Sequence, residues 1–232
     1  MTDEELSDTL RSRLSAIETR IADACGRADR RRQDVTLVAV TKSVGLRVIR
    51  RIVSLGVCDL GENRPQSIER RSKACADLPI RWHMIGHLQR NKIDSLLPRV
   101  VRIHAADSQR LLDGLAGGNP ATSPPVLIQF NISGEESKYG FAPDVVPTIP
   151  QSITVDGLMT MAPYEMTPER TRPVFRDLRE LRDRLEQKMG RKLPQLSMGM
   201  SGDFECAIEE GATLVRIGST LFEGLPDADE GE

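Results

Sequence analysis

The sequence predicts an α/β protein built as a closed (β/α)8 TIM barrel. Three observations support this: eight short apolar runs recur along the 232 residues, helical segments separate most of them, and polar residues follow most of the runs. Continuous apolar runs are typical of buried parallel strands, and their alternation with helices indicates βα units. Eight such units in about 230 residues fit a barrel. An open doubly wound sheet is the alternative, although no GxGxxG follows the first run.

The predicted elements follow one another in a simple order. An extra amphipathic helix over residues 3–25 comes first, since its apolar side chains step by three or four residues, and Gly26 closes it. The strands are expected at residues 35–40, 57–63, 81–87, 100–107, 126–133, 152–161, 193–200 and 213–220. Helices are expected between them at residues 46–56, 65–77, 91–97 and 203–211. Another helix is expected to begin after a cap at Asp107 or Ser108. A further helix is expected to begin at Pro168, with Thr167 as its cap, and to end at Gly190. We expect one domain over residues 1–232, with a core at about 5–224 and an acidic C-terminal tail.

Composition and charge disfavour several classes of function. The net charge of −2 and the 3% of aromatic residues disfavour a nucleic-acid surface. No run approaches the roughly 18 apolar residues of a membrane helix. The N-terminus "MTDEELSDTL" lacks the basic and apolar regions of a signal peptide. The four cysteines form no CxxC pair and the three histidines have no metal spacing. We therefore expect a cytoplasmic protein with unpaired thiols, no metal, and no nucleic-acid or membrane partner.

The stretch "LVAVTKSV", residues 37–44, carries the first candidate site residue. Lys42 follows a buried-looking strand, and the C-terminal strand ends of a barrel are where active sites form. If partly desolvated and close to Arg216, this lysine would be a neutral nucleophile able to form a Schiff base with an aldehyde. The alternative is a surface lysine whose stem packs against the strand end.

The loops after the seventh and eighth strands predict an anion site. "MGMSGDF" places Ser201 ahead of a helix that begins near Asp203, and "RIGST" places Gly218 and Ser219 after a strand. Small residues let backbone N–H groups approach a ligand, a helix N-terminus favours anions, and barrels often bind phosphate at these two loops. The alternative is that both are ordinary tight turns.

Arg216 lies inside the eighth predicted strand, on the same face as Leu214. A permanently charged guanidinium in that position needs a partner. A salt bridge inside the barrel to a carboxylate such as Glu62 is one interpretation, and donation to a ligand atom is the other.

Other polar residues are weaker candidates. His83 and His104 are expected to be hydrogen-bonded structural histidines, whereas His87 lies on the rim and could touch a ligand or water. The basic run at 27–34 is expected to be a solvated helix end. The methionines of the sixth and seventh strands fit core packing, and two near the rim could pack on a flat ring.

The sequence resembles a known family, the pyridoxal 5′-phosphate (PLP) homeostasis proteins. These are single-domain relatives of the alanine racemase N-terminal barrel. The resemblance covers about residues 5–224 and rests on "VAVTKSV", "LGENRPQ", "RWHMIGHLQRNK", "FNISGEESKYGF", "GLMTMAP" and "LSMGMSGDFECAIEEGATLVRIGSTLFEG". It implies that Lys42 carries PLP as a Schiff base and that Ser201, Gly218 and Ser219 hold its phosphate. It further implies that Arg216 faces the pyridine nitrogen. The positions it places near the cofactor are Asn63, Met159 and Met200.

The resemblance implies a PLP-binding homeostasis protein without catalytic residues or robust turnover. An arginine donates to an unprotonated pyridine nitrogen, and such a ring is a poorer electron sink. Racemisation in two-domain relatives uses a tyrosine from a second domain, and neither Tyr139 nor Tyr164 lies in an equivalent segment. We expect a monomer that binds PLP, with PLP-dependent apo-enzymes as possible recipients. The alternatives are an amino-acid racemase-type PLP enzyme and a PLP-free aldolase with Lys42 as its amine.

The chain departs from the family pattern at two places. Arg64 follows Asn63 where the family usually has tyrosine, which could change what packs above the cofactor. The end reads "LFEGLP" where the family usually has FG and then a basic residue. The second departure concerns the terminal turn and leaves the loops around Ser201 and Gly218 intact.

Overall fold

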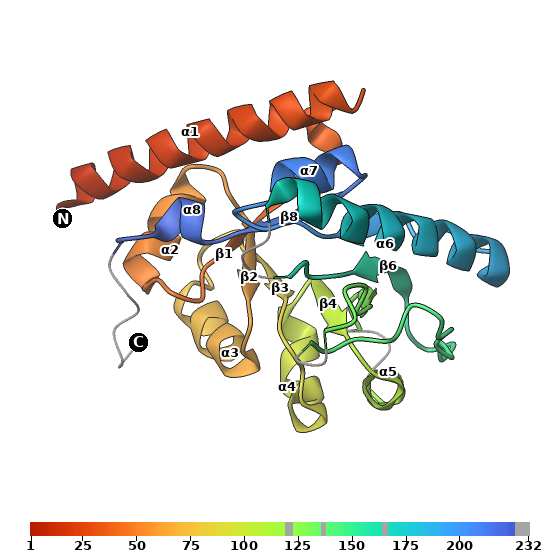
Figure 1. Cartoon of the computed structure of the whole chain (residues 1–232). Helices are drawn as coiled ribbons and strands as arrows, with labels where there is room; N and C mark the ends of the chain where they lie inside the picture. The colour runs from red at the N-terminus through yellow and green to blue at the C-terminus, as the bar shows by residue number, and fades with distance from the viewer. Residues whose placement is uncertain (119–122, 136–137, 164–166, 226–232) are drawn as a thin grey trace.

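The computed structural model describes residues 1–118, 123–135, 138–163 and 167–225. Its eight strands are parallel and close into a barrel in chain order, since β1 pairs with both β2 and β8 (Figure 1). This closure confirms the predicted (β/α)8 barrel and rules out the open sheet. The strands are β1 Thr36–Val40, β2 Asp59–Glu62, β3 Arg81–Met84, β4 Arg102–Ala106, β5 Val126–Gln129, β6 Val155–Met159, β7 Gln195–Ser197 and β8 Leu214–Ile217.

Helices lie outside the barrel and connect most of its strands. They are α1 Asp3–Arg27, α2 Leu46–Ser54, α3 Pro65–Ala74, α4 Ile93–Leu96, α5 Gln109–Ala116, α6 Pro168–Met189, α7 Phe204–Glu209 and α8 Ser219–Phe222. The described residues also form the short 3-10 helices η1 Arg32–Asp34, η2 Arg90–Lys92 and η3 Leu97–Arg99. Between β5 and β6 the described residues contain no helix. Within the described ranges no helix is long and apolar enough to cross a bilayer.

The N-terminal helix α1 lies across the outside of the barrel, along α2, α7 and α8 (Figure 1). Its start is a capping box in which Thr2 Oγ1 accepts from the Glu5 N–H at 3.2 Å and Glu5 Oε2 accepts from the Thr2 N–H at 2.7 Å. Four of its large apolar side chains are fully buried: Leu6, Leu10, Ile17 and Ile21. Burying each such side chain contributes about 1.5–3 kcal/mol, so α1 is part of the core. The helix ends at Arg27, slightly beyond the predicted end.

Two other predicted boundaries are confirmed. Ser108 Oγ accepts the Leu111 N–H at 3.3 Å and so caps α5. Gly190 ends α6 in the left-handed region, with φ of 63°, where glycine has no Cβ penalty.

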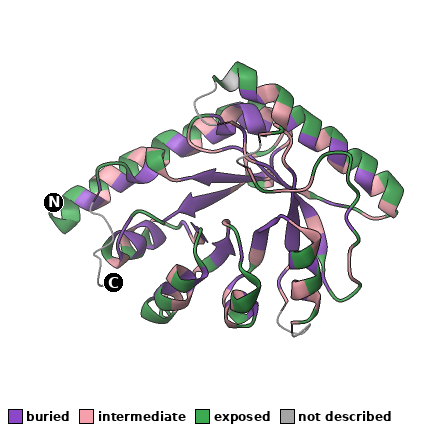
Figure 2. Ribbon diagram, turned by 60° about the horizontal axis from the view of Figure 1, so that its bottom comes forward, coloured by how far each residue is buried: buried purple, intermediate pink, exposed green. Residues whose placement is uncertain are grey.

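Burial divides the molecule into two apolar layers. The strands are buried except for one residue near the start of β1, β2, β3, β4, β6 and β7, and the helices turn buried faces inward and exposed faces to solvent (Figure 2). The larger layer fills the space between strands and helices. A small separate cluster comes from five strands: Val38, Ala105, Leu127, Met159 and Leu214. Buried polar side chains also come from the strands, among them His83, His104, Ser197 and Arg216.

Candidate functional site

The predicted site residues come from the C-terminal ends of five strands, β1, β2, β6, β7 and β8, and therefore share one rim of the barrel. Lys42 lies two residues beyond β1, and Asn63 directly follows β2. Arg216 is the last residue but one of β8, and Gly218 directly follows that strand. Ser201 lies in the loop between β7 and α7. Parallel strands all present their carboxyl ends to one face, which explains why positions far apart in sequence meet there.

The β7 and β8 loops meet at Ser201. Its Oγ accepts the backbone N–H groups of Gly218 and Thr220, both at 3.3 Å. Gly199 makes the turn into this loop, since its φ is 92° and a Cβ there would lie 2.6 Å from the Ala207 Cβ. Converging N–H groups beside a hydroxyl form a donor set suited to an anion. Ser219 follows Gly218 and is exposed.

Asp203 limits what the following helix offers to an anion. Its Oδ1 accepts the Met200 N–H at 2.6 Å, and burial raises the pKa of this carboxyl. The helix α7 spans only Phe204–Glu209 and begins beside this carboxylate. A carboxyl group therefore lies at the start of the helix whose N-terminus the sequence predicted as favourable to an anion.

Hydrogen bonds to the backbone on either side of Lys42 fix the position of this residue, whereas its side chain makes none within the described residues. The neighbouring Thr41 is buried, and its Oγ1 donates to Glu62 Oε1 at 2.5 Å. Arg71 pairs with the same carboxylate and donates to the carbonyls of Thr41 and Val44, both at 2.7 Å. This Arg71 clamp brackets Lys42 on both sides and fixes where its side chain leaves the backbone.

The side chain of Lys42 is exposed, so the desolvation invoked from the sequence is not present. Within the described part of the chain its amine has no hydrogen-bond or ion-pair partner. An exposed primary amine on a rigid backbone is accessible to an incoming aldehyde. The support that Arg71 gives to the backbone around Lys42 was not predicted, because nothing in the polar helix pattern of residues 65–77 distinguished this arginine from its neighbours.

Arg216 is buried, with 4% exposure, and has neutral acceptors. Its Nη1 donates to Ser197 Oγ at 2.5 Å and its Nη2 to the Thr160 carbonyl at 3.0 Å. The predicted alternative of a salt bridge to Glu62 is wrong, because that carboxylate pairs with Arg71. No carboxylate of the described residues lies within ion-pair distance of Arg216. Burial lowers the pKa of Arg216 to about 10, and the charge of Asp203 partly opposes this shift.

The remaining predicted positions differ in exposure. Met159 is fully buried in the interior cluster, with Met161 packed against it. Met200 is half-buried and Asn63 is exposed. Gly86 allows the β3 loop to pass the Asn63 backbone, since a Cβ there would lie 2.3 Å from the Asn63 carbonyl oxygen. Arg64, the departure from the family pattern, is exposed and precedes α3.

His87 has partners on the rim that the sequence did not indicate. Its Nδ1 lies 2.5 Å from Asp107 Oδ2, and its ring stacks on Tyr139 with centroids 4.8 Å apart. These residues follow β3, β4 and β5 respectively, so they belong to the same rim. Local sequence contained no signal for this grouping, because the three positions lie 20 or more residues apart.

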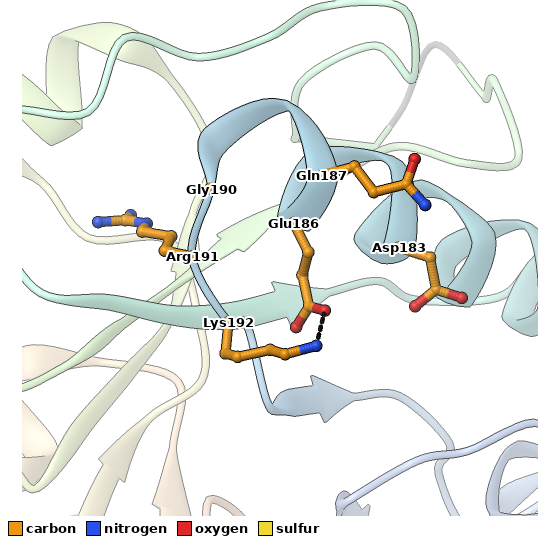
Figure 3. Close-up of a pocket in the computed structure, with 6 residues that line it drawn as sticks. All are labelled: Asp183, Glu186, Gln187, Gly190, Arg191 and Lys192. Atoms are coloured by element: carbon orange, nitrogen blue, oxygen red, sulfur yellow. Dashed lines mark hydrogen bonds and ion pairs between the residues drawn. The ribbon is translucent and has the colours of Figure 1, made fainter.

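A hollow of about 520 Å³ lies away from this rim, where α6 ends before β7 (Figure 3). Its lining is charged, and Lys192 Nζ pairs with Glu186 Oε2 at 3.1 Å. Loops that precede strands lie at the opposite end of a barrel from those that follow them. This hollow therefore contains none of the predicted site residues. Among the described residues, no group of three or more His, Cys, Asp or Glu side chains is placed to hold a metal ion.

The closed barrel with an added N-terminal helix is of the alanine racemase type. No model of a known protein family matches the chain. A pyridoxal phosphate homeostasis protein of Aquifex aeolicus is 44% identical over 219 residues, covering 90% of this chain and 96% of that protein. The crystal structure of a protein of unknown function from Bifidobacterium adolescentis matches with a TM-score of 0.83 and 31% identity, over 96% of this chain and 98% of that one.

The structure of PipY of Synechococcus elongatus with PLP bound matches with a TM-score of 0.73 and 30% identity, over 87% of this chain and 99% of PipY. The identity and coverage of these relatives place the chain in a family. This chain belongs to the pyridoxal phosphate homeostasis proteins.

Proposed function

We propose that this chain binds pyridoxal 5′-phosphate at the rim and acts in PLP homeostasis in the cytoplasm. The observation that supports this best is the environment of Arg216, a buried guanidinium whose acceptors in the described structure are all neutral. Such a group retains charge and donor capacity for a ligand acceptor. The Aquifex relative is named a pyridoxal phosphate homeostasis protein, and PipY was solved with PLP bound.

Each part of the cofactor has a matching group in the described residues. Lys42 would hold PLP as a Schiff base, because its amine is exposed and its backbone is clamped. Ser201, Gly218 and Ser219 would bind the phosphate through their hydroxyl and N–H groups. Arg216 would donate to the pyridine nitrogen. The residues proposed to lie beside the ring are Asn63, Met159 and Met200.

We infer that robust catalytic turnover is not the role of this site. When bound, PLP acts as an electron sink for reactions at the α-carbon of amino acids. An arginine leaves the pyridine nitrogen unprotonated and so weakens that sink. The function proposed is to bind PLP as a monomer and release it to PLP-dependent apo-enzymes.

Reduction of the PLP-loaded protein with borohydride tests the attachment. We expect a visible absorbance band that borohydride removes, and a reduced pyridoxyl group on the peptide that contains Lys42. The variant Lys42→Ala should lack the borohydride-sensitive band. A band that survives in Lys42→Ala, or a label on another lysine, would overturn the assignment.

The absence of turnover has its own test. Exchange of the α-proton of amino acids in deuterated water should not exceed that of free PLP at the same concentration. Exchange far above free PLP would favour the racemase-type alternative. His87→Gln would then show whether the His87, Asp107 and Tyr139 group supplies the base.

A further inference from the structure

A continuous line of polar side chains crosses the inside of the barrel from Arg216 to the opposite end. Arg216 Nη1 donates to Ser197 Oγ, and His104 Nδ1 lies 2.8 Å from the same oxygen. His104 Nε2 lies 2.9 Å from His83 Nδ1, and His83 Nε2 lies 3.0 Å from Asp59 Oδ1. The five side chains come from β8, β7, β4, β3 and β2, and no local segment contains two of them.

The two ends of this line differ in solvation. The side chain of Asp59 is 14% exposed and pairs with Arg81, whose Nε and Nη2 donate to it at 2.8 and 2.5 Å. Asp59 and Arg81 line a cavity of about 240 Å³ on the side of the barrel where β2 begins. Burial opposes the charge of Asp59, but hydrogen bonds from His83 and Arg81 lower its pKa to about 2. The line therefore has a stable carboxylate at one end and a buried guanidinium at the other.

The ionisation states allow only one direction of donation. Burial lowers the pKa of both His83 and His104, so both rings are neutral. His83 must use its Nε2–H to donate to the carboxylate of Asp59, which leaves Nδ1 as an acceptor. His104 must then donate from Nε2, and its Nδ1 accepts the hydroxyl proton of Ser197. The Ser197 oxygen is left to accept from Arg216, so every donor along the line points toward Asp59.

We propose that Asp59, His83, His104 and Ser197 are positioning residues that orient Arg216 through the barrel. Chains of hydrogen bonds polarise one another in a low-dielectric interior, so each donor strengthens the next acceptor. A carboxylate placed directly on Arg216 would occupy donors that a ligand needs. The line instead uses one Nη1 donor of Arg216 and ends in a carboxylate at the opposite end of the barrel. The inference rests on the proposed function, because it assumes that Arg216 faces the cofactor.

Histidine nitrogen NMR tests the direction of the line without any cofactor. The chain has three histidines, so isotopically labelled histidine gives few signals, and His87→Gln assigns the third. In PLP-free wild-type protein we expect His83 and His104 as neutral rings protonated at Nε2. A charged ring, or Nδ1 protonation of either residue, would overturn the proposal.

The variant Ser197→Ala breaks the line next to Arg216, and Asp59→Asn changes its far end. Ser197→Ala removes one oxygen, and Asp59→Asn removes a charge at the far end of the line from the cofactor. We expect each to weaken PLP binding about ten-fold, the effect of losing one buried charge-assisted hydrogen bond. Asp59→Asn should also produce a mixed tautomer at His104. The matched control is Asp156→Asn, because Asp156 is a partly buried carboxylate that pairs with Arg102 at 2.6 Å and lies outside the line.

The outcomes separate this inference from the function proposed above. If wild-type protein binds PLP on Lys42 while Ser197→Ala and Asp59→Asn behave like Asp156→Asn, the inference fails and the proposed function stands. If wild-type protein binds no PLP, the proposed function fails, and the role of the line toward a cofactor fails with it. Lowered thermal stability with unchanged PLP affinity, spectrum and tautomers would also reject the inference, since that describes a merely structural role.

Discussion

Two buried arginines, Arg71 and Arg216, have opposite environments. Arg71 lies behind the β1 loop, pairs with the carboxylate of Glu62, and donates to two backbone carbonyls. Arg216 lies inside the barrel and donates to a hydroxyl and one carbonyl. Both side chains are almost inaccessible, with 3% and 4% exposure. Burial alone therefore does not distinguish an arginine that holds a loop from one that is proposed to donate to a ligand.

The difference lies in how the charge is compensated. Glu62 and two carbonyls satisfy Arg71, so it holds a loop in place. Arg216 has no carboxylate within ion-pair distance in the described structure and keeps donor capacity. A buried ion pair stabilises only when both partners are present, and losing one partner leaves an uncompensated charge. The two sites should therefore respond differently to the same substitution.

The largest expected effect is that of Arg71→Met. It leaves the Glu62 carboxylate buried without its partner, so we expect the unfolding free energy to fall by about 3–5 kcal/mol. Urea titration measures this loss. The matched variant Arg216→Met removes a buried charge without orphaning a carboxylate and should cost far less. Equal losses in the two variants would contradict the comparison.

Acid should destabilise the Asp59 end of the polar line. The folded-state pKa of Asp59 is about 2, below its value of 3.8 in a model compound, so the unfolded state binds the proton more readily. The resulting stability is present above about pH 4, is lost as the pH falls toward 2, and amounts to about 2 kcal/mol. Urea titrations of wild type and Asp59→Asn across this range should converge at the acid end. Parallel curves would show that Asp59 does not carry this stability.

Ser201→Ala should weaken PLP binding more than it lowers the stability of the fold. It removes the acceptor of the Gly218 and Thr220 N–H groups, which are partly buried, so we expect a stability loss of at most about 1 kcal/mol. Loss of one phosphate donor should weaken PLP binding several-fold, as measured by absorbance titration. Ser54→Ala is the control, since that hydroxyl donates only to a carbonyl of its own helix. Equal PLP affinity in the two variants would remove Ser201 from the site.

The smallest expected effect on stability is that of Lys42→Ala. The side chain is exposed and has no partner among the described residues, so the PLP-free variant should unfold at the same urea concentration as wild type. Its defect should appear only with PLP present. A clear loss of stability in the PLP-free variant would mean that Lys42 has a structural role, as the Arg71 clamp does.

Much of the barrel could be predicted from the sequence, and so could the positions of the site residues on its rim. The strand runs are continuous apolar stretches, and each leads into a polar turn that parallel pairing brings to one end. Lys42, Ser201 and Arg216 were found from this rule. The environment of Lys42 was predicted less well, because the exposure of a side chain depends on what covers it. The support from Arg71 and the stacking of His87 on Tyr139 were not predicted at all.

The sequence by itself determined which segments form the eight strands and most of the longer helices, and which polar residues end the strands. Apolar periodicity and capping are local signals, because apolar side chains recur with the period of the helix or strand and a cap lies next to the helix that it closes. Only the tertiary structure decided that Glu62 pairs with Arg71 and not with Arg216. It also decided that His83 and His104 connect Asp59 to Ser197. The closure of the barrel sets these partners, because strand register determines which inward side chains of separate strands come within hydrogen-bond distance.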